Sequence, residues 1–528
     1  MLSDSISYRE SGYFTPLVTD YLDKKIDSQL YNRFPTLENF EAQILQKKEN
    51  CTNDAREVLG TVIKQQYKAI DASELTANNI EALRGSSTFS VTTGHQLNLF
   101  TGPLYFLYKI VTTINLTREL AAKYPQYNFV PIYWMATEDH DFEEINYFNF
   151  KGKKFRWNAE STGPVGRLST AGLKEFYEIY SLELGSSQNA EHIKQLFKAA
   201  YLEHETLAEA TRYLANALFG AHGLVIVDGD DAALKQEFVP YIKEELLKHT
   251  AYNKVNETIK ALNNYAIQVN PREINLFYIE DKLRERIIFE KGLYKINNTA
   301  REFTEAEILL HVEVHPERFS PNVITRPLYQ EVILPNLCYV GGGGEIAYWL
   351  ELKSYFDAEK VVFPILLLRN SALLITKKQI EKAGRLNLSA KDLFKKQGDL
   401  LNEKVKVLSE FPIDLEAQKE VLRKQFAYLK NIAQRTDPSF TGSVNAQEAK
   451  QIKGLIHLEK RLQKAQKRKY ADQLERICEL QNDLFPNKSL QERQSNFSEF
   501  YIRQGDSLTA QLIGELNPLG QNFAVVEL

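Results

Sequence analysis

The residues best suited to bind an anionic ligand lie in a short glycine-containing peptide, Thr93–Pro103. The peptide follows a run that predicts a strand and precedes one that predicts a helix. It therefore lies at the carboxyl end of a strand, where open α/β sheets bind ligands. Free amides at the helix start favour an anion such as phosphate, and His95 and Gln96 add side-chain donors. Turn formation alone is the alternative, because the peptide matches neither a Walker A loop nor GxGxxG.

A second cluster of ionisable residues, Glu138-Asp139-His140-Asp141, directly follows the predicted strand Pro131–Thr137. Such groups are costly to bury without partners, and a histidine between carboxylates tends to keep its proton. The cluster could bind a divalent cation, orient a substrate amine or transfer a proton. A solvated acidic turn that caps the next element is the alternative.

Four consecutive glycines, Gly341–Gly344, lie between a predicted strand and a predicted helix. Glycine loses the most backbone entropy on ordering, so four in a row are hard to explain by stability alone. Close approach of the backbone to a phosphate or carboxylate is a better reason. Glu345 then complements the helix dipole or faces the ligand. A flexible linker is the alternative, although apolar elements flank the glycines on both sides.

One arginine upstream of the glycines, Arg326, immediately precedes a helix-starting proline. Its guanidinium could bind a carboxylate or phosphate through two hydrogen bonds, and a surface salt bridge is the alternative. Cys338 lies inside a predicted strand and is interpreted as a small core residue. No role is assigned to the histidines that lack neighbouring functional residues, which are His222, His311, His315 and His457.

The elements that must position these peptides alternate between strands and amphipathic helices. After Gly102, apolar residues from Leu104 to Ile114 form one helical stripe, and another helix begins near Gly344. This alternation predicts βαβ units and a largely parallel sheet. A hairpin through Asp281-Lys282 predicts an inserted antiparallel subdomain. The predicted sheet strands are Phe89–Thr93, Phe129–Met135, Leu224–Val227, Asn336–Val340 and Val361–Leu368.

The pattern changes near residue 375, which divides the chain into a predicted α/β core, 1–375, and a helical region, 376–528. Leucines recur every seven residues in the helical region, as at Leu415, Leu422 and Leu429, which predicts coiled-coil helices. Asp437-Pro438 separates two of these helices. The heptads do not distinguish an intramolecular helical hairpin from pairing with a second chain. The tail, Phe523–Leu528, predicts a short strand.

Composition limits the classes of protein to which the chain can belong. Its 528 residues carry 65 Lys and Arg and 69 Asp and Glu, for a formal charge of −4. This balance predicts no affinity for nucleic acid or anionic lipid. Three scattered cysteines predict neither a disulfide framework nor a thiolate zinc site. The acidic first residues predict no signal peptide, and no apolar run is long enough to span a membrane, so we expect a cytoplasmic protein.

Taken together, these segments resemble the BshC family of cysteine-adding enzymes in bacillithiol biosynthesis. The resemblance runs over nearly the whole chain in order and spacing. It is carried by TGHQLNLFTGPLYFLYKI at Thr93–Ile110, PIYWMATEDHDFEEIN at Pro131–Asn146, FSPNVITRPLYQEVILPNLCYVGGGGEIAYWLELK at Phe319–Lys353 and FPNKSLQER at Phe485–Arg493.

The resemblance implies a Rossmann-like core with inserted connecting segments, followed by an α-helical coiled coil used for homodimerisation. It also implies a ligase that joins the carboxyl of L-cysteine to the amine of glucosaminyl-malate. Because a free carboxylate does not condense with an amine in water, ATP or ADP with Mg²⁺ is expected. At the matched positions, we expect catalytic roles for His95, Asp139, His140 and Asp141. We expect substrate or nucleotide binding by Gly94, Gln96, Thr101, Gly102, Asn322, Arg326, Gly341, Gly342, Gly343, Gly344, Glu345, Tyr348 and Trp349.

Within this set, the phosphates are expected at the glycine amides and His95, and the malyl carboxylates at Arg326. Asp139, His140 and Asp141 are expected to deprotonate the amine, or Asp139 and Asp141 to hold Mg²⁺. No zinc is expected. Two other functions remain open: nucleotidyl transfer on the same core, and a non-catalytic scaffold whose coiled coil binds a partner.

Overall fold

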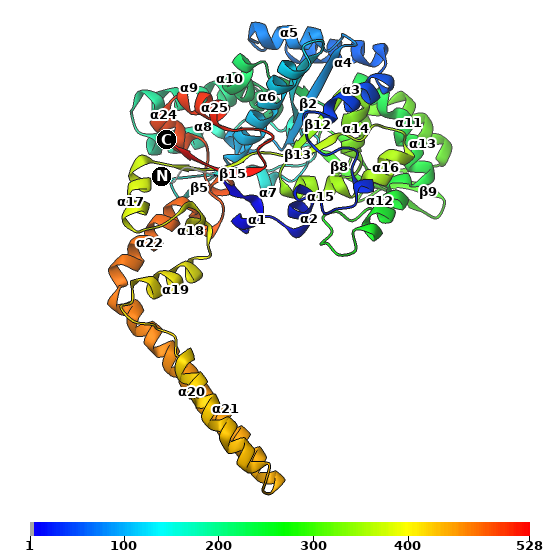
Figure 1. Ribbon diagram of the computed structural model, residues 1–528. Helices are drawn as coiled ribbons and strands as arrows, with labels where there is room; N and C mark the ends of the chain where they lie inside the picture. The colour runs from blue at the N-terminus through cyan, green and yellow to red at the C-terminus, as the bar shows by residue number, and fades with distance from the viewer. Residues whose placement is uncertain (1–4) are drawn as a thin grey trace.

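A computed structural model describes residues 5–528, so the first four residues of the segment considered for a signal peptide lie outside it. Figure 1 shows a large α/β body from which a long pair of helices projects as an arm. The helices before the main sheet are α1 (Tyr8–Ser11), α2 (Pro16–Leu22), α3 (Asn39–Asn50), α4 (Asn53–Gln66) and α5 (Glu74–Ala82).

The main sheet has five strands in the order β13-β12-β2-β3-β6, and every neighbouring pair is parallel. Its strands are β2 (Thr88–His95), β3 (Asn128–Met135), β6 (Val225–Asp228), β12 (Asn336–Gly341) and β13 (Ile365–Leu368). All five predicted strands and the parallel sheet are thus confirmed, although the last strand begins at Ile365 and not at Val361. Nearly all of their residues are buried, as apolar strands covered on both faces must be.

The strand order makes this sheet Rossmann-like and locates its ligand-binding edge. Numbered along the chain, the five strands lie in the order 5-4-1-2-3, the reverse listing of the Rossmann order 3-2-1-4-5. The direction of winding changes between β2 and β12. Ligands bind outside the carboxyl ends of the strands at such a switch point, and the peptides after β2 and β12 are the two glycine-containing peptides.

Helix α6 (Tyr105–Lys123) connects β2 to β3 and buries the predicted apolar stripe. Its start differs from the prediction, because residues Leu99–Thr101 form a 3-10 turn first. The amide of Leu104 donates to the carbonyl of Ser495, and the Asn496 side chain donates to the carbonyl of Gly102. The C-terminal region therefore covers this helix start. The prediction of free amides there is wrong.

Two insertions interrupt the Rossmann-like core. The first follows β3 and comprises α7 (Phe142–Ile145), β4 (Tyr147–Phe150), β5 (Lys153–Arg156), α8 (Leu173–Leu184), α9 (Gln188–Leu202) and α10 (Leu207–Phe219). The second follows β6 and comprises α11 (Ala232–Lys248), α12 (Thr250–Ala261), β7 (Leu276–Glu280), β8 (Leu283–Glu290), β9 (Leu293–Ile296), β10 (Glu302–Phe303), α13 (Glu305–Val314), β11 (Phe319–Pro321) and α14 (Thr325–Ile333).

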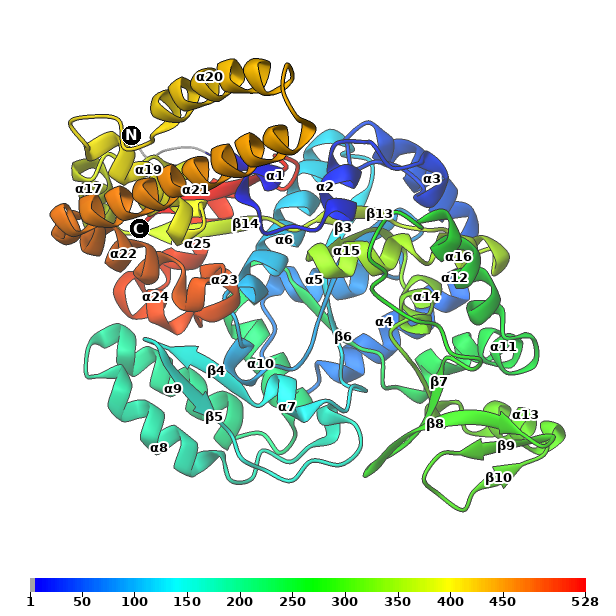
Figure 2. The ribbon, with the colours of Figure 1, turned by 90° about the horizontal axis from the view of Figure 1, so that it is seen from below.

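The second insertion confirms the predicted antiparallel subdomain and enlarges it. Strands β7 and β8 form the predicted hairpin, with Glu280 opposite Leu283. They belong to a five-stranded antiparallel sheet in the order β10-β9-β8-β7-β11. Figure 2 shows this sheet and the β4–β5 pair on opposite sides of the core. Two short helices after β12, α15 (Gly343–Leu350) and α16 (Lys353–Ala358), complete the core.

The projecting arm is a hairpin of α20 (Glu416–Ala433) and α21 (Pro438–Lys469), which lie side by side along their shared length (Figure 1). Lys419 pairs with Glu459 across the two helices at 2.5 Å. The structure therefore pairs these two heptad helices within one chain. The remaining helices of this region are α17 (Lys377–Arg385), α18 (Ala390–Phe394), α19 (Gln397–Leu408), α22 (Ala471–Leu484), α23 (Gln491–Gln494), α24 (Ser498–Gln504) and α25 (Ser507–Glu515).

The C-terminal end of the chain returns to the core. The predicted terminal strand is confirmed as β15 (Asn522–Glu527), which pairs in parallel with β14 (Ser371–Ile375). On its other side β15 pairs with β1 (Ile6–Ser7), so the two ends of the described chain meet. Within residues 5–528, no helix has the length and apolarity that crossing a membrane requires.

Candidate active site

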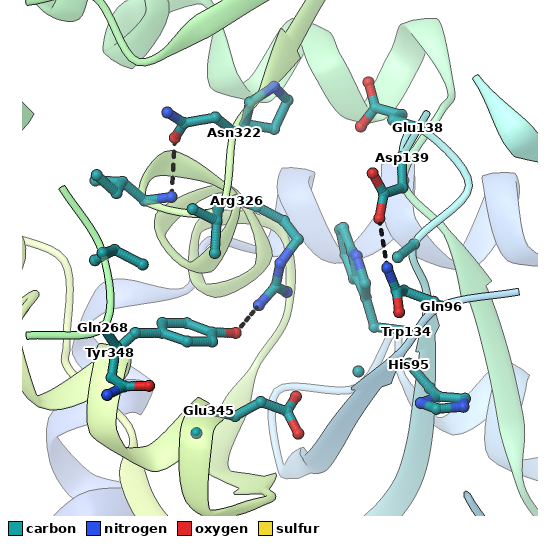
Figure 3. Close-up of a pocket in the computed structure, with 18 of the residues that line it drawn as sticks. His95, Gln96, Trp134, Glu138, Asp139, Gln268, Asn322, Arg326, Glu345 and Tyr348 are labelled. Atoms are coloured by element: carbon teal, nitrogen blue, oxygen red, sulfur yellow. Dashed lines mark hydrogen bonds between the residues drawn. The ribbon is translucent and has the colours of Figure 1, made fainter. Parts of the chain in front are cut away.

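The three glycine and acidic peptides converge on one cavity of about 800 Å³ at the switch point of the sheet. This volume is typical of small-molecule sites. Figure 3 shows Arg326, Tyr348 and Gln268 facing Gln96, Asp139 and Trp134 across it. The expected residues that line the cavity are Gly94, His95, Gln96, Asp139, Asn322, Arg326, Gly342, Gly343, Gly344, Glu345 and Tyr348.

At the end of β2, backbone and side chains connect the first peptide to the glycine loop. Lys109 of α6 donates to the carbonyl of Gly94 at 2.6 Å and pairs with Glu345 at 2.6 Å. His95 is buried, and its Nε2 has no hydrogen-bond partner among the described residues. Burial, with the charges of Lys109 and Arg369, holds the pKa of His95 well below its usual value. The imidazole is therefore neutral and offers one nitrogen to a ligand.

Asp139 lines the cavity as a charged carboxylate. It accepts hydrogen bonds from the Gln96 side chain at 2.9 Å and from the His140 amide at 2.7 Å. Burial raises the pKa of Asp139, but the bonds from His140 and Gln96 and the charge of Arg284 outweigh it and hold the pKa well below its usual value. The carboxylate thus stays ionised at neutral pH.

The neighbouring Glu138 has the opposite electrostatic environment. It is buried, lines the same cavity and accepts a hydrogen bond from the fully buried Lys235. Burial and the nearby charge of Asp230 raise the pKa of Glu138, and Lys235 offsets only part of that effect. Two adjacent carboxyl groups whose pKa values move apart are suited to different roles in one reaction.

The rest of the acidic cluster points elsewhere. Asp141 caps α7 by accepting from the amide of Glu144 at 3.3 Å, and neither it nor His140 lines the cavity. His140 instead meets Arg284 at 2.8 Å. Of the two carboxylates expected to hold Mg²⁺, only Asp139 therefore lines the cavity. In the described part of the chain, no three His, Cys, Asp or Glu side chains group as metal ligands would.

The glycine loop joins β12 to α15. Gly342 is the N-cap residue, and its amide donates to the Glu345 carboxylate at 2.8 Å. None of the four glycines has a left-handed φ. A Cβ on Gly343 would lie 3.3 Å from Phe14, whereas a Cβ on Gly344 would meet nothing within 4 Å. Packing therefore accounts for part of this run, and the cavity lies against the rest.

Arg326 projects into the cavity from the start of α14. It donates to the Tyr348 hydroxyl at 3.0 Å and to the Gln330 side chain at 3.1 Å. Burial lowers the pKa of Arg326, but the nearby Tyr348, Tyr339 and Glu345 outweigh burial and raise it. Arg326 is thus a fixed cation with no carboxylate hydrogen-bonded to it among the described residues.

Some expected site residues do not reach the cavity. Thr101 and Gly102 lie just before α6, where the C-terminal region of the chain covers them. Gly341 ends β12, and Trp349 is fully buried in the core. Asn322 lines the cavity, yet its side chain chiefly shapes the turn before α14. The residues outside the lining are Thr101, Gly102, His140, Asp141, Gly341 and Trp349.

The main feature that the sequence reasoning missed is the number of cations. Seven Lys and Arg side chains line the cavity against three Asp and Glu. Arg369 follows the predicted strand Val361–Leu368, so the strand-end argument could have identified it. Arg326 was identified from the sequence, and the other five lie in helix, loop, hairpin and C-terminal segments where the sequence analysis assigned no cation a role. The seven are Lys109, Arg272, Arg284, Arg286, Arg326, Arg369 and Arg493.

Comparison with known proteins places the whole chain in one family. Residues 1–370 match the N-terminal Rossmann-like domain of bacillithiol biosynthesis BshC, and residues 372–528 match its C-terminal coiled-coil domain. A Flavobacterium johnsoniae protein is 63% identical and one from Flavobacterium psychrophilum 60%, with all of each chain covered. A Christiangramia forsetii protein is 57% identical over the whole chain and 99% of its own length.

Each of these three relatives has the name "Putative cysteine ligase BshC". The resemblance found in the sequence motifs is therefore confirmed, together with the Rossmann-like and coiled-coil fold class. The chain belongs to the BshC family of ligase enzymes in bacillithiol biosynthesis.

Proposed function

We propose that the chain forms bacillithiol by joining the carboxyl group of L-cysteine to the amine of glucosaminyl-malate, with ATP activating the carboxyl group. The observation that carries this proposal is the cavity at the switch point, where a cation-rich lining faces Asp139 and Glu138. A nucleotide and a malyl group are both polyanionic, whereas the acceptor amine is cationic until it loses a proton. One cavity thus offers complementary charge to every reactant.

The proposed reaction proceeds in two transfers. A cysteine carboxylate oxygen attacks a phosphorus atom of ATP and displaces ADP or pyrophosphate. The acceptor amine then attacks the acyl carbon, forms the amide and expels phosphate or AMP. The ammonium must release one proton before this attack, because only the neutral amine is nucleophilic.

The cations and the glycine loop bind the anions. Arg326 presents a planar guanidinium, which suits a malyl carboxylate. The amides that start α15 and the cations around them suit phosphate oxygens, whose charge changes during transfer. Neutral His95 can add a single hydrogen bond. The substrate and nucleotide contacts expected from the sequence are thus kept for those residues that line the cavity.

The two carboxyl groups have different roles toward the acceptor amine. Asp139, held ionised, binds and orients the ammonium. Glu138, with its raised pKa, is the better proton acceptor. This assignment moves the proton-transfer role from His140 and Asp141, which lie outside the lining, to Glu138.

We also propose that the chain acts in the cytoplasm as a homodimer joined through α20 and α21. Several large apolar side chains on this arm are exposed although the two helices already pair with each other. Such a surface suits a second copy of the same arm, since coiled-coil helices often add partners along an apolar seam.

The assay that tests the proposed function uses the purified full-length chain with ATP, Mg²⁺, L-cysteine and glucosaminyl-malate. Mass spectrometry should detect bacillithiol, and omission of either ATP or cysteine should abolish it. Pyrophosphate–ATP exchange that proceeds equally well without cysteine would instead favour nucleotidyl transfer. Absence of product with any nucleoside triphosphate would contradict the ligase assignment.

A further inference from the structure

The C-terminal segment Phe485–Arg493, to which no role has been given, returns to the edge of the cavity. Glu492 is fully buried and forms two hydrogen bonds with Arg369, at 2.7 Å to Nη2 and 3.1 Å to Nη1. Ser371 and the amide of Ala372 donate to the same carboxylate. A carboxylate from the C-terminal region thus fixes a cavity-lining arginine of the core.

This pairing leaves one nitrogen of Arg369, Nε, without a partner. Nη1 also donates to the carbonyl of Asn370 at 2.8 Å and to Ser371 at 3.1 Å, so both terminal nitrogens are occupied. Nε is buried and has no hydrogen-bond partner among residues 5–528. Only 3% of the Arg369 side chain is exposed. A buried N–H donor without a partner is uncommon and calls for an acceptor.

The free Nε faces the glycine loop. It lies 3.7 Å from the position that a Cβ on Gly342 would occupy. Gly343 and Gly344 begin α15, where amides lack partners within the helix and the helix dipole favours negative charge. Both glycines line the cavity with Arg369. Arg369 and these two glycines, which follow two neighbouring strands, therefore line the same cavity.

The charge around this volume also favours an anion. Glu492 neutralises Arg369, and Glu345 neutralises Lys109, so neither pair adds a net negative charge. Arg493, the residue after Glu492, is exposed, lines the cavity and forms no ion pair with a described residue. An oxygen of a phosphate or carboxylate would satisfy the free donors.

We propose that Glu492 is a positioning residue that holds Arg369 so that its Nε–H and the amides of Gly343 and Gly344 bind one anionic oxygen of a substrate. The inference deepens the proposed function, on which it rests for the identity of the substrates. It also gives the Phe485–Arg493 segment a role: the C-terminal region completes the cavity that the Rossmann-like core begins.

The test measures ligand binding by calorimetry on the full-length chain, with ADP·Mg²⁺ and malate as separate probes. E492Q removes the charge that fixes Arg369, and R369K retains a cation but lacks Nε–H. Each variant should weaken at least one probe tenfold or more. Weaker ADP binding would assign the oxygen to a phosphate, and weaker malate binding would assign it to a carboxylate.

A double variant separates positioning from general damage. If Glu492 acts through Arg369, R369K/E492Q should bind the affected probe no more weakly than R369K alone. E331Q is the matched control, because Glu331 is an equally buried acid that faces Lys47 at 3.5 Å and does not line the cavity. It should lower the melting temperature without changing the dissociation constant for ADP·Mg²⁺. The control applies to this probe alone, because Gln330 donates to Glu331 and accepts from Arg326, the residue proposed to bind a malyl carboxylate.

Three results would overturn the inference: wild-type affinity for both probes in E492Q, additive losses in the double variant, or no binding of either probe to the wild-type chain. Loss of probe binding in E492Q and R369K, combined with no bacillithiol from the wild-type chain, would instead refute only the proposed function. The anion subsite would then remain established.

Discussion

At the level of single residues, the adjacent carboxyl groups of Glu138 and Asp139 carry the chemistry of the acceptor amine. Their environments differ because Asp139 receives hydrogen bonds from Gln96 and His140, whereas Glu138 is buried beside Lys235. The sequence showed that ionisable residues cluster after this strand. The sequence could not show which of these side chains point into the cavity, because their direction depends on the turn into α7.

Asp139→Asn should lower kcat/KM for glucosaminyl-malate by at least a hundredfold. The neutral amide cannot hold the ammonium, and such an ionic hydrogen bond contributes about 1.5–3 kcal/mol, with more lost when it acts in the transition state. Steady-state kinetics measures this loss, and circular dichroism checks that the variant is folded. Asp141→Asn is the matched control from the same cluster, because it lies outside the cavity and asparagine also caps helices. Equal losses in the two variants would contradict the assignment.

Some contacts between site residues could not be predicted from any local motif. Arg369 and Glu492 are 123 positions apart, and Lys109 meets Glu345 from another helix. Pairs of this kind follow from how the sheet and the C-terminal region come together. The strand-end residues Gly94, Asp139 and Gly342 were found because each lies next to a strand that its own residues predict.

At the level of elements, the strands were predictable because buried parallel strands are continuous apolar runs. The order of the strands in the sheet was not predictable, since it depends on which strand edges pair. The start of α6 was mispredicted for a related reason: Asn496, 394 positions from Gly102, supplies its cover. The heptads predicted long helices, and the short break before α21 allowed them to pair within the chain.

Within the second insertion, a buried acid on α11 contacts α12 and the segment before β7, with a consequence for stability. Glu245 accepts hydrogen bonds from the amide of Asn275 at 2.8 Å, from the side chain of Asn275 at 2.9 Å and from the amide of Ala251 at 2.9 Å. Burial raises the pKa of Glu245 to about 7, because these hydrogen bonds only partly offset the loss of water. The folded state therefore keeps this proton at pH values where the unfolded state has released it.

Because the pKa of Glu245 is higher in the folded state, its contribution to the free energy of unfolding should fall as pH rises from about 4.5 to 7. The loss should be about 3 kcal/mol. Urea titrations at several pH values measure it as the difference between wild type and E245Q, in which that pH dependence should vanish. E244Q, on the same helix, should retain the wild-type slope. If the free energy of unfolding of E245Q depended on pH as that of the wild type does, the raised pKa of Glu245 would be contradicted.

At the level of the whole molecule, the arm is the surface that we propose for dimerisation. Its exposed apolar side chains include Val421 at 58% and Tyr428 at 70% exposure, both on α20. In sedimentation, the wild-type chain should have twice the mass of the 60.7 kDa chain at micromolar concentration. V421E/Y428E should be monomeric, because unpaired carboxylates on an apolar seam are costly to bury.

Leu182→Glu is the control for the arm variant, since Leu182 is 85% exposed on α8, away from the arm. It should leave the mass unchanged. A wild-type monomer at micromolar concentration, or a dimer that survives V421E/Y428E, would contradict dimerisation through α20 and α21.

The central claim is that one cavity activates the cysteine carboxyl group with ATP and then passes it to an amine. The most direct measurement supplies L-cysteine labelled with ¹⁸O in both carboxyl oxygens and follows the label by mass spectrometry. We predict one ¹⁸O in the released phosphate or AMP and one in the amide of bacillithiol. Bacillithiol that forms while the phosphorus product contains no ¹⁸O would contradict activation of the carboxyl group by ATP.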